Sequence, residues 1–289
     1  MTRIDVRKTY KLFVGGEFPR SESGHSYVVN DARGRFVANA ALASRKDARD
    51  AVIAARKAFP GWSGRTAYNR GQVLYRVAEV MEDRRPQFVD AVRQGEGGTA
   101  AGAAKVVAAA IDRLVWYAGW ADKLTQVVGN ANPVAGPFFN LSTPEPTGVV
   151  AVVAPTGSSL LGLVSVVAPV VVSGNTLVVA ASPDRPLPAV TFAEVLATSD
   201  VPAGVINVLT GDFDRTVPTL ASHMDVNAID LTGLAGDPEQ GQACEVAAAE
   251  NLKRIRRAPG SEPDWSADPG TDRMTGFLET KTVWHPIGV

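Results

Sequence analysis

Val149-Val-Ala-Val-Val153 is the first of four short apolar runs that decide the fold of this chain. The other three are Thr176–Val179, Val205–Leu209 and Ala228–Leu231. Short runs that are apolar throughout and rich in β-branched residues are typical of parallel strands covered on both faces. We therefore expect four buried strands in this part of the chain.

Segments long enough for crossover helices accompany these runs, at Leu187–Ala197, Arg215–Ser222 and Glu239–Asn251. The run Leu160–Val172 is ambiguous, because its valines favour a strand while its length favours a helix, and we interpret it as a helix. Alternation of strands and helices predicts an α/β fold with a doubly wound, Rossmann-type sheet.

Three amphipathic helices are predicted before the sheet. The first spans residues 45–58 and ends before Pro60, the second ends or breaks at Pro86, and the third runs to about Leu124. We interpret the aromatic residues of the third helix as packing residues rather than as a ligand-stacking patch; they are Trp116, Tyr117 and Trp120.

The end of the chain has a different composition. Residues 260–276 are rich in Pro, Gly, Asp and Ser, which predicts a linker. The run Thr280–Trp284 contains β-forming residues but has no sequence neighbour for a hairpin. We expect it to add to a sheet elsewhere, either in this chain or in another subunit.

Composition excludes several classes of function. A net charge of −1 over 289 residues argues against a dedicated nucleic-acid binder, and we interpret the densest basic cluster, residues 253–257, as a solvated strand or loop. A single cysteine, a charged N-terminus and no apolar run long enough for a bilayer predict a cytoplasmic protein without disulfides or membrane contact. The three histidines are far apart, and no spacing indicates a metal site.

A series of motifs covering about nine-tenths of the chain resembles the aldehyde dehydrogenase family, in the order that the family has. They are Phe13–Gly16, Ala54–Trp62, Tyr117–Lys123, Pro146–Val150, Ser173–Thr176, Pro202–Val208, Asp230–Gly233 and Ala249–Lys253. The resemblance implies a domain of N-terminal helices and cofactor-type sheet over residues 1–259. It also implies an oligomerisation arm at about residues 137–149, which is joined by a closing strand at residues 277–289.

The resemblance fails where the family has its chemistry. The segment with the catalytic cysteine is missing after Pro259, and the chain resumes at Phe277, as in the truncated second module of two-module aldehyde dehydrogenases. The family's general base is a glutamate, and its position holds Ala258. Its oxyanion asparagine is replaced by Gly157.

The cofactor positions are also depleted. The resemblance leaves a vestigial cofactor site made by Pro155, Ser182, Gly211 and Gly233. The lysine and glutamate that hold the ribose in the family correspond to Ala180 and Pro183, and the serine at the pyrophosphate corresponds to Leu234. We therefore expect no cofactor, with weak NAD or NADP binding as the alternative.

Gly241-Gln-Ala-Cys244 imitates the family's nucleophile motif but lies before Asn251-Leu252, whereas the family's nucleophile follows that motif. We interpret Cys244 as a helix residue rather than a catalytic one. Our leading hypothesis is an inactive subunit that assembles with itself or with a full-length aldehyde dehydrogenase. An NAD(P)-dependent aldehyde oxidoreductase that uses Cys244, and a nucleotide- or aldehyde-sensing module, are the alternatives.

Overall fold

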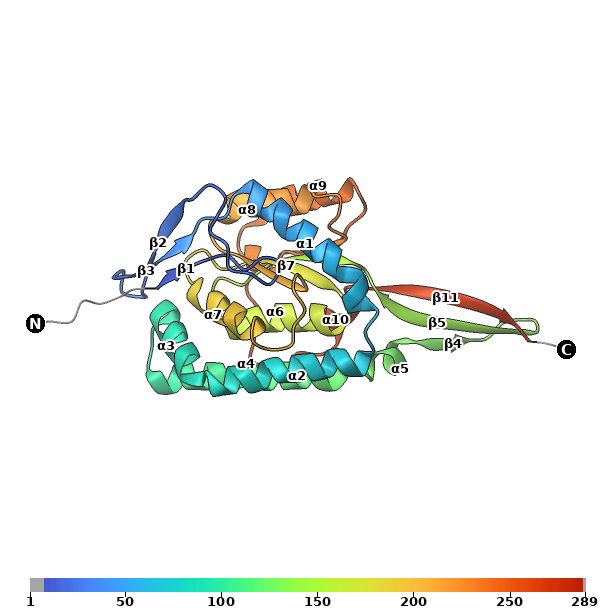
Figure 1. Ribbon diagram of the computed structural model, residues 1–289. Coiled ribbons are helices and arrows are strands. Elements are labelled where there is room, and N and C mark those ends of the chain that lie inside the picture. Colours follow the sequence, from blue (N-terminus) through green and yellow to red (C-terminus); the bar gives the residue numbers. More distant parts are fainter. Residues whose placement is uncertain (1–7, 288–289) are drawn as a thin grey trace, which may run out of the picture.

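The computed structural model describes residues 8–287 and contains a five-stranded sheet, two three-stranded sheets and the helices around them (Figure 1). The first half comprises β1 Thr9–Tyr10, β2 Ser26–Asn30, β3 Phe36–Ala41, α1 Arg45–Ser63, α2 Ala67–Asp83, α3 Arg85–Glu96, α4 Ala100–Trp120, α5 Leu124–Val128, β4 Asn130–Asn132 and β5 Phe138–Pro146. The second half comprises β6 Val149–Val153, α6 Leu161–Val172, β7 Thr176–Ala180, α7 Leu187–Leu196, β8 Ile206–Leu209, α8 Phe213–Ser222, β9 Ala228–Asp230, the 3₁₀ helix η1 Thr232–Leu234, α9 Pro238–Ala249, β10 Arg254–Arg256, α10 Asp272–Thr275 and β11 Leu278–Pro286.

The central sheet is parallel, with the strand order β10-β9-β6-β7-β8. The chain enters at β6, continues outward to β7 and β8, and then crosses to β9 and β10 on the other side. This order confirms the doubly wound α/β prediction and places the reversal point between β6 and β9. In such sheets ligands bind outside the carboxyl ends of the strands at the reversal point.

Helices cover both faces of this sheet. α1, α8 and α9 lie over one face, whereas α6 and α7 lie over the other, with α2 and α4 as a further layer outside α6 (Figure 1). Alternate residues of β6 enter different core clusters: Val149 packs with α1 and α8, and Val150 packs with α4 and α6. α6 is buried along its whole length, so the helix prediction for this valine-rich run is confirmed although no polar face marks it.

Prolines have two different effects on the N-terminal helices. The predicted end or break at Pro86 is confirmed, because α2 ends at Asp83 and Pro86 lies in the first turn of α3. The prediction that the first helix ends before Pro60 is wrong, because α1 continues to Ser63. The last turn of α1 is fixed by Trp62, which is buried and donates from Nε1 to the carbonyl of Val171 at 3.0 Å. Tertiary packing therefore overrides the local cost of the proline.

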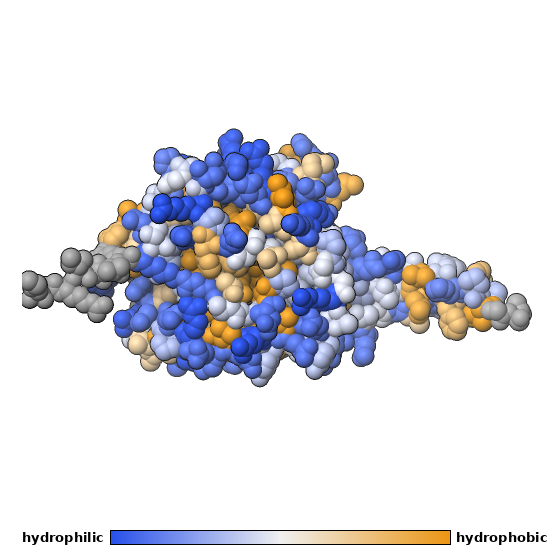
Figure 2. All heavy atoms as spheres, in the orientation of Figure 1, coloured by the Kyte–Doolittle hydropathy of each residue, from blue (hydrophilic) through white to orange (hydrophobic). Residues whose placement is uncertain are grey.

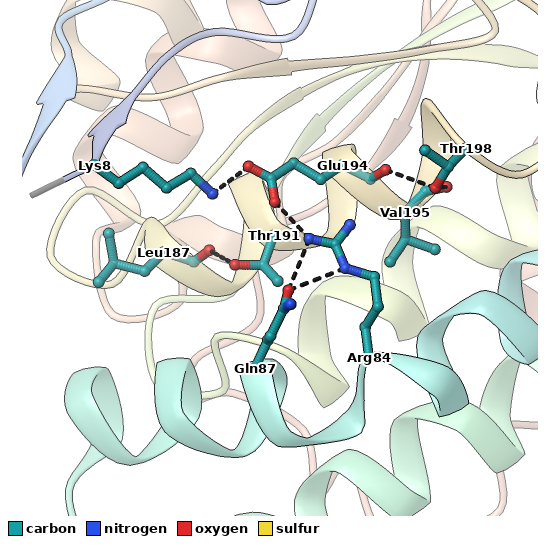
Figure 3. A network of polar contacts seen from close by, with 8 residues as sticks. All are labelled: Lys8, Arg84, Gln87, Leu187, Thr191, Glu194, Val195 and Thr198. Atoms are coloured by element: carbon teal, nitrogen blue, oxygen red, sulfur yellow. Dashed lines mark hydrogen bonds and ion pairs between the residues drawn. The ribbon is translucent and has the colours of Figure 1, made fainter.

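A charged contact joins three segments at the end of the molecule that carries α3 (Figure 3). Glu194 of α7 pairs with Lys8 and, at 2.7 Å, with Arg84 at the break between α2 and α3. Arg84 also donates to Gln87. Burial opposes ionisation of Glu194, but the hydrogen bonds from Lys8 and Arg84 outweigh it and lower its pKa.

The second three-stranded sheet, β11-β5-β4, forms an arm that projects from the body (Figure 1). β11 runs antiparallel along the full length of β5, from Leu278 opposite Pro146 to Pro286 opposite Phe138. The closing strand therefore adds to a sheet of its own chain, which selects one of the two arrangements left open by the sequence. Lys281 and Glu145 form an ion pair of 3.0 Å across the pair of strands.

Residues 260–276 are predominantly irregular in backbone, yet they pack closely against the body. Trp265 and Met274 are buried in the larger core cluster. Arg113 of α4, itself buried, donates to the carbonyls of Trp265 and Ala267 at 2.8 and 3.0 Å. Composition indicated the irregular backbone but gave no sign of these contacts, because they join the segment to residues far away in sequence.

The prediction of a solvated basic cluster is wrong for Lys253. A left-handed residue, Leu252, turns the chain between α9 and β10 and is itself exposed. Lys253 is consequently buried, its ammonium group contacts the side-chain carbonyl of Asn251, and burial lowers its pKa.

No helix within residues 8–287 is long and apolar enough to cross a membrane.

Candidate functional site

The four predicted cofactor positions all lie at the carboxyl edge of the central sheet. Pro155 follows β6, Ser182 follows β7, Gly211 follows β8 and Gly233 follows β9 within η1. The parallel topology therefore brings these positions to the edge where doubly wound sheets bind their ligands.

Both glycines are explained by close packing of the chain against itself. A Cβ atom on Gly233 would lie 2.2 Å from the carbonyl oxygen of Ala154, so η1 closes directly on the end of β6. Gly211 has a φ of +122°, and a Cβ atom there would lie 2.9 Å from Leu42. At Gly233 the chain therefore fills part of the reversal point between β6 and β9 with its own backbone.

Ser182 is buried, and its hydroxyl has no hydrogen-bond partner within residues 8–287. Pro155 is buried beside Gly162, where an added Cβ atom would lie 3.1 Å from the proline ring. Of the four predicted positions, only Ser182 thus carries an unused polar group.

A cavity of about 510 Å³ lies between β2, the end of α3 and the loop after β7. Its charged lining residues are Asp31, Glu96, Asp184, Asp212 and Arg185. The pKa of Tyr27, which lines this cavity, is raised mainly by burial and further by the charges of Asp212 and Asp184. Four carboxylates and one guanidinium group create a negative potential, which disfavours a pyrophosphate.

The turn between β6 and α6 is bound to two carboxylates of the chain itself. The backbone N–H of Gly157 donates to Oε1 of Glu262 at 2.5 Å. The backbone N–H and hydroxyl of Ser159 donate to Oε1 of Glu96 at 2.6 and 2.7 Å. Neither glutamate could be recognised from the sequence, because one ends α3 and the other lies in an irregular segment.

The family resemblance implies a dinucleotide cofactor, and the contacts at this edge show how far the residues present fit one. Two amide donors of the first turn are already bonded to carboxylates, and η1 is in contact with β6. The adjoining cavity is lined by acidic side chains. Ala180 and Pro183 offer no side-chain hydrogen bond to a ribose. Within the described residues, this edge therefore offers few free polar groups to a dinucleotide.

Ala258 and Gly157 follow different strands of the central sheet. Ala258 follows β10 and packs, half-buried, against the core cluster that includes α9. A Cβ atom added to Gly241 of α9 would lie 3.4 Å from the Cβ atom of Ala258. Gly157 is exposed in the turn after β6. Neither residue carries a side-chain group able to transfer a proton or donate a hydrogen bond.

Cys244 is buried on the inner side of α9, within the core cluster formed with α1 and α8. Burial first, and the charge of Asp237 second, raise the pKa of its thiol to about 11. A reactive cysteine needs an exposed, electropositive setting that lowers the pKa of its thiol. The surroundings of Cys244 have the opposite effect and keep the thiol protonated at neutral pH.

This burial predicts an inert thiol and a specific pH dependence. We expect iodoacetamide to label Cys244 rapidly only in denaturant. The thiol of the unfolded chain ionises at lower pH than the buried thiol of the folded chain. Burial of the neutral Cys244 thiol therefore stabilises the folded chain fully below about pH 8.5, and this stabilisation is lost as the pH rises towards 11. The free energy of unfolding should fall by about 2–3 kcal/mol more in the wild type than in Cys244→Ala over this range. Equal curves, or rapid labelling of the folded chain, would contradict the assignment.

Comparisons with known proteins agree with this geometry. Residues 18–265 match a family model described as the aldehyde dehydrogenase family. The chain is 32% identical over 275 residues to aldehyde dehydrogenase, cytosolic 1, of Elephantulus edwardii, covering 91% of this chain and 52% of that protein. It is 31% identical over 261 residues to cytosolic 10-formyltetrahydrofolate dehydrogenase of Mus musculus, covering 88% and 28%.

Solved structures show the same fold. PnpE from Pseudomonas sp. WBC-3 superposes with a TM-score of 0.81 at 29% identity, covering 86% of this chain and 50% of that one. PnpE has also been crystallised in complex with nicotinamide adenine dinucleotide. HpcC from Thermus thermophilus superposes with a TM-score of 0.80 at 28% identity, covering 86% and 47%. The chain thus spans about half the length of these structures.

Proposed function

The chain belongs to the aldehyde dehydrogenase family, and from this premise we propose that it is a non-catalytic subunit that assembles through its arm. Its partner is a second copy of this chain or a full-length aldehyde dehydrogenase. The observation that carries the proposal is the projecting sheet β11-β5-β4, which is attached to the body at one end (Figure 1).

The surface of the arm supports this role. Phe139, Leu141 and Trp284 are 60%, 42% and 57% exposed, and Figure 2 shows hydrophobic residues gathered along the outer part of the arm. Scattered apolar residues are ordinary on a protein surface, but a group of them on a projecting element indicates an interaction site. β11 also forms an outer edge of its sheet, where backbone groups are free to pair with a further strand.

Three features of the site support the absence of catalysis. Cys244 is buried with a raised thiol pKa, position 258 holds alanine, and a carboxylate lies against the backbone of Gly157. Hydride-transfer chemistry through a thioester needs an accessible thiolate and a general base. We therefore propose that selection acts on assembly rather than on turnover.

The mass of the purified chain by light scattering tests the proposal. The chain alone weighs 30.4 kDa, so self-association should give a multiple of that value. If the partner is a full-length relative, a stable mixed complex should form only when an aldehyde dehydrogenase from the same source is added. A mass of one chain in both experiments would contradict assembly by either route.

We also propose that no dinucleotide binds tightly, because this edge of the sheet, within the described residues, offers few free polar groups to one. Titration calorimetry with NAD and with NADP should give no saturable heat at concentrations that saturate a full-length aldehyde dehydrogenase measured as the control. A saturable signal would instead favour the nucleotide-sensing alternative, and Ser182, whose hydroxyl is unused, would be the first residue to replace.

A further inference from the structure

The turn after β6 has the features of a carboxylate-binding site that the chain fills itself. Three donors of different kinds converge on the side chain of Glu262. Gly157 donates its backbone N–H at 2.5 Å, Thr156 its hydroxyl at 3.3 Å, and Trp265 its indole N–H at 3.2 Å. The first two donate to Oε1 and the third to Oε2, so both oxygens of the carboxylate are held.

An independent observation shows that the turn is shaped for this group. A Cβ atom added to Gly157 would lie 3.0–3.1 Å from Cδ and both oxygens of Glu262. The carboxylate therefore lies against the Cα atom of residue 157, closer than a side chain at this position would normally allow. Glycine here creates the cradle as well as removing a side-chain donor.

The cradle is held in place from two sides. Arg185, in the loop after β7, donates from Nη1 to the carbonyl of Gly157 at 2.6 Å. Glu96, at the end of α3, binds the backbone N–H and hydroxyl of Ser159. The turn is thus fixed independently of Glu262, so its donors stay in position when that side chain is removed.

We propose that Thr156, Gly157 and Trp265 form a carboxylate-binding site, that Glu262 occupies it as an internal ligand, and that small monocarboxylates bind there once Glu262 is removed. The site lies at the carboxyl edge of the sheet, where the reversal of strand order opens the ligand crevice. The internal ligand therefore competes with any external carboxylate for these three donors. The proposal is independent of the assembly proposed above, since neither measurement depends on the other.

The test uses the full chain with Glu262→Ala, and acetate as the probe. We expect Tm to fall by about 3–6 °C in this variant and to recover in a saturable manner when acetate is added, but not with chloride at the same ionic strength. The amide resonance of Gly157 should shift with the same saturation curve. The wild type should show neither effect, because Glu262 already fills the site.

Two controls separate the site from a general effect of acetate. Glu145→Ala removes a carboxylate from an exposed ion pair on the arm and should show no acetate-dependent recovery. Adding Gly157→Ala to Glu262→Ala crowds the position of the carboxylate and should weaken acetate binding. A folded Glu262→Ala variant that does not respond to acetate would overturn the proposal. If Glu262→Ala does not fold, Glu262→Gln is used in its place. A Tm of Glu262→Gln equal to that of Glu145→Gln would then overturn the proposal.

Discussion

Replacing Arg273 by methionine is expected to lower the free energy of unfolding by about 3–5 kcal/mol. Arg273 of α10 donates to Oδ2 of Asp230, at the end of β9, at 2.8 Å, and the two side chains are 9% and 0% exposed. The guanidinium group also lies over the ring of Trp265, 5.0 Å from its centre. Without Arg273, the only hydrogen bonds left to this fully buried carboxylate within residues 8–287 are those from Thr232.

Urea denaturation with two companion variants measures this effect. Arg254→Met removes an ion pair with Glu279 whose side chains are 41% and 51% exposed, and it should cost no more than about 1 kcal/mol. Adding Asp230→Asn to Arg273→Met removes the stranded charge and should recover part of the loss. A loss for Arg273→Met within the range of the Arg254→Met control would contradict a structural role for the buried pair.

Loss of the arm is the second large effect, and it should change the mass of the assembly rather than the stability of the body. Deletion of residues 280–289 removes β11 beyond its first two residues and leaves Phe277 and Leu278, which are buried in the core. A deletion from residue 277 would confound assembly with folding, because the carbonyl of Phe277 accepts from Asn175 and Thr147. The shorter deletion should abolish assembly in size-exclusion chromatography and light scattering.

Single substitutions test the role of the arm in assembly without removing a strand. Phe139→Lys and Trp284→Lys each place a charge among the exposed apolar residues of the arm and should shift the mass towards 30.4 kDa. Val246→Lys, on α9, replaces an apolar side chain that is 67% exposed and should leave the mass unchanged. Assembly that survives the deletion and both arm substitutions would exclude the arm as the interface.

The sheet was predictable because its signal is local and redundant. Val149–Val153 is buried at every position, so the uniform apolar run marks β6 directly. The same uniformity made the run leading to Val172 ambiguous, since a helix buried on all sides has no polar face to give it a period. Its length resolved the ambiguity.

The polar contacts at the edge of the sheet were not predictable, because each joins single residues from distant segments. Glu262 reaches Gly157, and Arg273 reaches Asp230, without any periodic pattern that marks either partner. The sequence marked Gly157, Gly211 and Gly233 as positions of the site, but it did not predict the close backbone and side-chain contacts that each glycine makes. Their close contacts depend on which backbone lies opposite, and that follows only from the packed fold.

The arm also has a consequence for the order in which the molecule forms. Ser142 of β5 and its neighbour across the strands, Thr282 of β11, are 140 positions apart, and the whole central sheet lies between them in sequence. Closing so long a loop carries an entropic cost that is reduced once the intervening residues are compact. We therefore expect the body to fold before β11 pairs with β5. On this expectation, the surface proposed for assembly forms only on chains whose body has already folded, so incompletely folded chains would be excluded from the assembly.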